Sequence, residues 1–321
     1  MASETPNSHD DSTSGFATVV APTPSGIARP ATSLVPDEPL PFAVQRITVG
    51  LLQRAIGDLR PKDAASFDKG VHSARKKLKR LRGMLRLVRD DIGYRAYREE
   101  NVVMRNTARS LSGIRDAWVL AATLQDLRKR YADLLDEQTF STPEAWLIQR
   151  HEERRRVVTG QVVTNAITNL GTARSRFAKY PIEEAISNDY AAIAGGIERV
   201  YTRGHRGLAR AVETRSVEDL HEWRKRVKYL RYQMEALTPL YPRLIGPTAR
   251  GLDELGELLG DDHDLAVLAE TILEHPESCR DERERWMLIA LIHEQRTSLQ
   301  IAALSHGPVS YTHLRAHETK T

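Results

Sequence analysis

Residues 71–88 read VHSARKKLKRLRGMLRLV and residues 220–237 read LHEWRKRVKYLRYQMEAL, so one pattern occurs twice in the chain. The matched basic positions are His72 with His221, Arg75 with Arg224, Lys76 with Lys225, Lys79 with Lys228, and Arg82 with Arg231. A second block follows in each half, LSGIRDAWVL at 111–120 and LGDDHDLAVL at 259–268. Two blocks in the same order predict a duplicated helical unit.

Helical geometry separates each repeated segment into two faces. At about 100° per residue, the apolar residues form one stripe, which we expect to face the core. The first basic stripe lies beside it and consists of His72, Arg75, Lys79, Arg82 and Arg86. The second basic stripe consists of His221, Arg224, Lys228 and Arg231. Because each basic stripe borders a buried face, we expect it to line a groove.

The balance of charge in these segments favours an external anion. Residues 71–89 contain eight Lys and Arg but no Asp or Glu, and residues 224–231 contain five, again without a carboxylate. A charge run is more often a solvated helix face, but here no carboxylate one turn away relieves the repulsion. We therefore expect a polyanion site on both stripes, with Lys76 and Lys225 included. Arg203, Arg206 and Arg210 could extend it, and Glu235, which matches Arg86, shortens the second stripe.

The apolar spacing along the rest of the chain predicts an all-α fold, without an alternating strand pattern. Most prolines after residue 42 fall between segments of helical period. The expected helices cover residues 42–59, 66–90, 93–111, 116–134, 143–178, 183–213, 217–238, 243–259, 263–275 and 279–304. Asp116 and Asp264 are expected to cap helices or to pair with arginines.

Both ends of the chain differ in composition from this helical region. Residues 1–41 hold seven of the fifteen prolines with many Ser and Thr, which predicts a disordered leader. Residues 308–321 do not continue the helical pattern and resemble translated sequencing-adapter sequence, so we expect a non-native tail without functional residues. The single cysteine excludes an internal disulfide, and no apolar run suits a membrane span. These features favour a cytoplasmic protein.

The repeated pattern resembles the conserved histidine α-helical domain, known as CHAD, over about residues 42–305. The resemblance implies two pseudo-symmetric four-helix-bundle repeats, 42–179 and 182–305, around a basic central groove. It further implies binding of inorganic polyphosphate by the two basic stripes and association with polyphosphate granules. It implies no catalytic residue, no metal and no cofactor. The chain departs from the family pattern at Ser112, where the family usually has glycine.

Two other functions are compatible with the sequence. A metal-dependent phosphohydrolase could use the dyad His263–Asp264, although the matching position in the first half is Arg115–Asp116 and not a ligand pair. A nucleic acid would be attracted by the same basic stripes, but few aromatic residues accompany them and no recognised nucleic-acid module occurs. Neither oligomeric state nor the length of the bound polyphosphate follows from the sequence.

Overall fold

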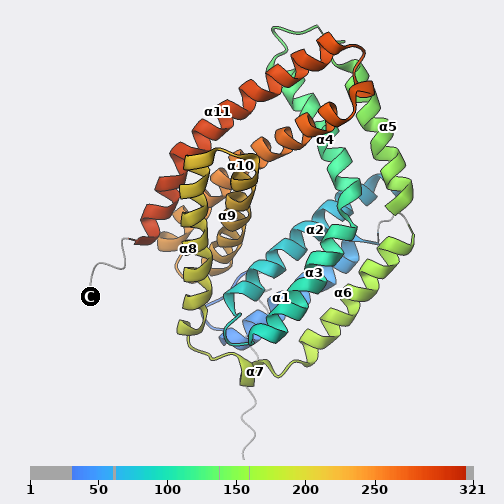
Figure 1. Ribbon diagram of the computed structural model, residues 1–321. Coiled ribbons are helices and arrows are strands. Elements are labelled where there is room, and N and C mark those ends of the chain that lie inside the picture. The colour runs from blue at the N-terminus through green and yellow to red at the C-terminus, as the bar shows by residue number, and fades with distance from the viewer. Residues whose placement is uncertain (1–30, 61–62, 137, 159, 316–321) are drawn as a thin grey trace, which may run out of the picture.

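The computed structural model describes residues 31–60, 63–136, 138–158 and 160–315 (Figure 1). These residues form eleven α-helices, one short 3₁₀ helix and no strand, which confirms the all-α fold class. The α-helices are α1 (Leu40–Asp58), α2 (Ala64–Leu87), α3 (Tyr94–Ser110), α4 (Ser112–Arg130), α5 (Ser141–Val158), α6 (Gln161–Lys179), α7 (Ile182–Ala185), α8 (Ala191–Thr214), α9 (Val217–Leu237), α10 (Pro242–Glu274) and α11 (Glu282–Arg315). None of the helices in these ranges is both long and apolar enough to cross a bilayer.

Four of the expected helices differ from the structure in their continuity. The segment 143–178 is divided at Gly160, whose φ of 90° suits glycine and ends α5 before α6 begins. The segment 183–213 is divided into the short α7 and the long α8. By contrast, 243–259 and 263–275 form the single helix α10, which contains Pro247. The glycine at position 160 was therefore a usable signal, whereas the LGDD sequence at 259–262 is not a helix break.

The two repeated segments form α2 and α9, and their apolar stripes are buried as predicted. All twelve apolar positions have exposed fractions of 5% or less, from Val71 to Leu237. The two helices pack against each other at Gly83, where an added Cβ would lie 3.2 Å from the Tyr232 Cβ. Arg80 pairs with Glu235 at 2.7 Å on one side of this contact. Arg86, which follows Arg80 on α2, stacks on Tyr229, which precedes Glu235 on α9. The two helices therefore cross antiparallel.

The helices enclose two hydrophobic cores. The larger core is formed by α1, α2, α3, α6, α8, α9 and the first part of α10. The smaller core joins α4 and α5 to the second part of α10 and the first part of α11. Figure 1 shows the long helices α10 and α11 extending from α8 and α9 toward α4 and α5. The two halves of the chain are thus joined at two places, and their division into two pseudo-symmetric bundles stays a prediction.

The described part of the expected leader is ordered, which corrects the prediction for residues 31–41. Leu34 is only 1% exposed, and its backbone N–H donates a hydrogen bond to the Ala236 carbonyl at 2.8 Å. The carboxylate of Glu38 is buried and accepts a hydrogen bond from Arg46 Nε at 2.9 Å. The proline-rich composition hid this packing, because the groups that hold the segment, such as the Ala236 carbonyl and Arg46, lie in other parts of the chain. Residues 1–30 lie outside the described residues.

The expectation that the helical pattern stops at Pro308 is also wrong. Helix α11 contains this proline and continues to Arg315. The side chain of Tyr311 is 2% exposed, and its backbone carbonyl accepts a hydrogen bond from the Tyr201 hydroxyl at 3.0 Å. This packing does not bear on where residues 308–321 come from, so their non-native origin stays a prediction. Residues 316–321 lie outside the described residues.

The approach of α8 to α2 requires glycine at position 196. A Cβ added to Gly196 would overlap the backbone carbonyl of Leu87, which cannot move away as a flexible side chain could. We expect Gly196→Ala to lower the free energy of unfolding by about 1–3 kcal/mol, as overpacking does. Gly171→Ala on α6 is the control, because a Cβ there meets nothing within 4 Å. It should raise stability by about 0.5–1 kcal/mol. Urea titration monitored by circular dichroism measures both, and equal effects would contradict this account.

Candidate functional site

Arg75 of the first basic stripe lies in the protein interior. Its side chain is 9% exposed, and its Nη1 donates a hydrogen bond to the backbone carbonyl of Ala108 near the end of α3. This bond fixes α2 against the junction of α3 and α4, where the second repeated block begins. The position therefore has a structural role in holding two helices together, and little of its guanidinium is left for a ligand.

Arg82 and Arg86 lie further along α2 and have uncharged partners. Arg82 Nε donates to Asn101 Oδ1 at 3.0 Å, and Arg86 Nη1 donates to the same oxygen at 3.2 Å. The Arg86 guanidinium also stacks on the Tyr229 ring, 3.9 Å from its centroid. Burial lowers the pKa of Arg86, and the neighbouring charges of Arg82 and Arg226 lower it further. Two crowded guanidinium groups thus meet no carboxylate within the described residues.

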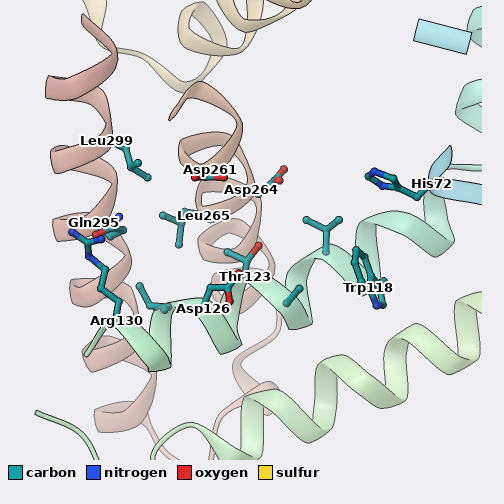
Figure 2. A pocket seen from close by; sticks show the side chains of 13 residues that line it. His72, Trp118, Thr123, Asp126, Arg130, Asp261, Asp264, Leu265, Gln295 and Leu299 are labelled. Carbon is teal, nitrogen blue, oxygen red and sulfur yellow. The ribbon is translucent and has the colours of Figure 1, made fainter. Parts of the chain in front are cut away.

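A hollow of quite different character lies at the other end of α2. It has a volume of about 430 Å³ and is bordered by His72 of α2, by α4 and by the facing parts of α10 and α11 (Figure 2). We call it the acidic hollow, because Asp126, Asp261 and Asp264 line it with only Arg130 as a positive residue. Burial raises the pKa of Asp261, and the nearby Asp264 carboxylate adds to the shift. His72 is exposed at this hollow and not in a basic groove.

In the second half, Arg224 repeats the buried position of Arg75. It is 7% exposed and pairs with Asp264 of α10, Nη2 to Oδ1, at 3.8 Å. Asp264 thus pairs with an arginine as expected, but it lies within α10 and caps no helix start. The side chain of Asp116 lies outside the described residues.

Carboxylates compensate much of the second basic stripe. Arg231 pairs with Glu235 at 2.7 Å and with Asp253 of α10. Lys225 pairs with Glu222, one turn before it on α9. The expectation that repulsion in residues 224–231 is unrelieved is therefore wrong. The partners lie just outside that segment or on another helix, which a comparison confined to the segment could not reveal.

The histidine of the phosphohydrolase alternative, His263, contacts another histidine. His263 Nδ1 lies 3.2 Å from His221 Nδ1, and the ring centroids are 4.3 Å apart. His205 lies on α8, with its ring beside Tyr201 at a centroid distance of 6.4 Å. In the described ranges, no three His, Cys, Asp or Glu side chains are grouped so that they could hold a metal ion.

The candidate extension on α8 is only partly brought to the site. Arg206 and Arg210 are exposed, and Arg210 pairs with Asp219 at 3.1 Å. Arg203 instead borders a small hollow that Arg86 also borders. Sequence reasoning missed three further arginines there, Arg89, Arg199 and Arg226, because they lie outside the repeated positions. We call the five residues Arg86, Arg89, Arg199, Arg203 and Arg226 the arginine cluster.

Comparison with known proteins identifies the class of this helical protein. Residues 50–273 match the CHAD domain family. The structure is also similar to the crystal structure of the CHAD domain from the plant Ricinus communis, with a TM-score of 0.60 and 19% sequence identity. The match covers 86% of this chain and 95% of that one. No curated protein matches the sequence. The chain belongs to the CHAD domain family, as its repeated pattern indicated.

The burial of His221 makes stability depend on pH. Burial lowers the pKa of His221, and the positive charges of Lys225 and Arg224 lower it further, while Glu222 opposes them. The unfolded chain therefore binds more protons than the folded chain below pH of about 6.5, and stability falls as the pH falls through this range. We expect His221→Gln to flatten the dependence of Tm on pH between about 7 and 5.

The exposed His293→Gln on α11 is the matched control, and it should keep the wild-type slope. Differential scanning fluorimetry across the pH series measures all three proteins. A wild-type slope in His221→Gln would contradict the assigned role of this histidine.

Proposed function

We propose that this protein binds inorganic polyphosphate without catalysing its turnover, and that the C-terminal half of α2 is the main binding surface. The observation that carries the proposal is the crowding of Arg82 and Arg86, whose partners Asn101 and Tyr229 are uncharged. Lys79 lies one turn earlier on the same stripe and Lys76 is exposed beside it. Arg82 and Arg86 repel each other, and an anion that lies along the stripe would offset that repulsion.

The ligand class follows from the chemistry of the stripe and from the family. Arginine forms paired hydrogen bonds to non-bridging phosphate oxygens, and lysine adds compact charge. Polyphosphate offers many such oxygens and no bases, and the stripe offers few exposed aromatic side chains on which bases could stack. The CHAD resemblance implies polyphosphate as the anion, and with it a cytoplasmic protein that associates with polyphosphate granules. The second stripe contributes less, because Glu222, Glu235 and Asp253 already pair with its cations.

Removing charge from the first stripe tests the proposal. We expect Lys79→Gln/Arg82→Gln to weaken the binding of long-chain polyphosphate at least about tenfold, because two charge-assisted contacts are lost. The dependence of log K on log salt concentration should become shallower by about one to two units, since fewer counterions are released. Isothermal titration calorimetry at several salt concentrations measures both quantities.

The matched control is Lys179→Gln/Arg283→Gln, which removes the same two charges from exposed positions on α6 and α11. It should leave the affinity within about twofold of wild type, because α6 packs mainly on α1 and α3, and α11 mainly on α10 and α8. Charges at these positions are screened from the stripe on α2. Equal losses in the two double variants would mean that net charge alone determines binding, and the assignment to α2 would be wrong.

Two further measurements separate this function from the alternatives. Duplex DNA at equal phosphate concentration should fail to displace polyphosphate, since the arginines along α2 bind the phosphate groups of a single flexible chain and not the surface of a double helix. Phosphate release from polyphosphate with added divalent metal should stay at background and be unaffected by His263→Ala. Displacement by DNA, or metal-dependent release that His263→Ala removes, would overturn the proposal.

A further inference from the structure

The arginine cluster collects five guanidinium groups from three helices around one small hollow. Arg86 and Arg89 come from the end of α2 and the residues after it, Arg199 and Arg203 from α8, and Arg226 from α9. The walls between them are the rings of Tyr97 and Tyr229 with Gly196 and Val200. Of these five residues, only Arg86 belongs to a basic stripe. The other four are brought together by the packing of the helices.

The charge of this cluster is compensated only in part. Arg199 pairs with Asp90, and Arg226 pairs with Glu222 at 3.4 Å. Arg86, Arg89 and Arg203 have no carboxylate partner within the described residues, and Arg89 instead stacks on the Tyr94 and Tyr97 rings. Five guanidinium groups against two carboxylates leave an excess of three positive charges. One nitrogen of Arg199, Nη1, is buried and lacks an acceptor.

The size of the hollow limits what it can hold. Its volume is about 10 Å³, which is close to the space that a single water-sized group needs. A phosphate chain could not pass through such a space, but the outermost oxygens of a chain end could enter it. A terminal phosphoryl group also carries three non-bridging oxygens and a second ionisable proton, so it presents more charge than an internal unit.

We propose that the arginine cluster binds the terminal phosphoryl group of a linear polyphosphate chain whose following units lie along the first basic stripe. This inference rests on the proposed function and adds the direction in which the polyphosphate chain lies on the protein. Arg86 belongs to both surfaces, and its contact with Asn101 and Arg82 connects the hollow to the stripe. The chain end is then fixed at the junction of α2, α8 and α9, and the rest of the chain extends toward Lys79.

The test compares two ligands on three proteins, which are the wild type, one variant and one control. The ligands are a short linear polyphosphate of defined length and the same chain with both ends esterified. The variant is Arg89→Gln/Arg203→Gln, whose residues take part in no ion pair of the described structure, so that folding should be preserved. The control is Arg154→Gln/Arg283→Gln, which removes two charges from exposed positions on α5 and α11. Calorimetric titration at fixed salt gives the six affinities.

We expect esterification to weaken binding to the wild type and to the control by about tenfold, and the variant to lose about tenfold for the free-ended chain. The variant should show at most about a twofold effect of esterification, because the substitutions and the esterification remove the same interaction. Equal effects of esterification on variant and wild type would overturn the terminal site. If esterified chains still lose affinity in Lys79→Gln/Arg82→Gln, the binding surface on α2 survives that result. If the wild type bound neither ligand, both proposals would be wrong.

Discussion

Helices α2 and α9 cross at Gly83, where the missing side chain lets Tyr232 lie 3.2 Å from the position of an added Cβ. Much of the arrangement depends on this close approach. It brings Tyr229 under the Arg86 guanidinium and Glu235 against Arg80. It also aligns the two apolar stripes so that one core covers both. A larger residue at the crossing would separate the stripes and would expose the guanidinium groups that the tyrosine rings now cover.

The sequence predicted those parts of the structure that local spacing determines. The helical period identified α2 and α9 and their buried faces, because a helix must bury one apolar stripe. The same reasoning could not show that Arg75 and Arg224 face the Ala108 carbonyl and Asp264, since those partners come from other segments. Nor could it place Arg199 beside Arg86, because no repeat or period relates α8 to the end of α2. The order of residues 31–41 was missed for a similar reason, because the groups that hold them, such as the Ala236 carbonyl and Arg46, lie in other segments.

The repeated pattern contains both buried arginines and partly accessible ones. The arginines at the second matched basic position, Arg75 and Arg224, are the most buried charges of the two stripes. Burying a cation is costly unless it is paired, so these positions are constrained by folding before any ligand is considered. Residues that bind an external anion must keep part of their charge accessible, as Arg82 and Arg86 do. The parts of a motif that are easiest to recognise in a sequence are here the parts that build the scaffold.

The second hydrophobic core has a mechanical consequence. Helices α4 and α5 of the first half meet α10 and α11 of the second half, while α2 meets α9 elsewhere, so the chain forms a closed frame with two joints. A frame fixed at two joints cannot hinge about either without breaking the other. The distance between the acidic hollow and the arginine cluster is therefore set during folding. Any ligand that uses either surface meets groups already in position, so binding does not carry the entropic cost of arranging them.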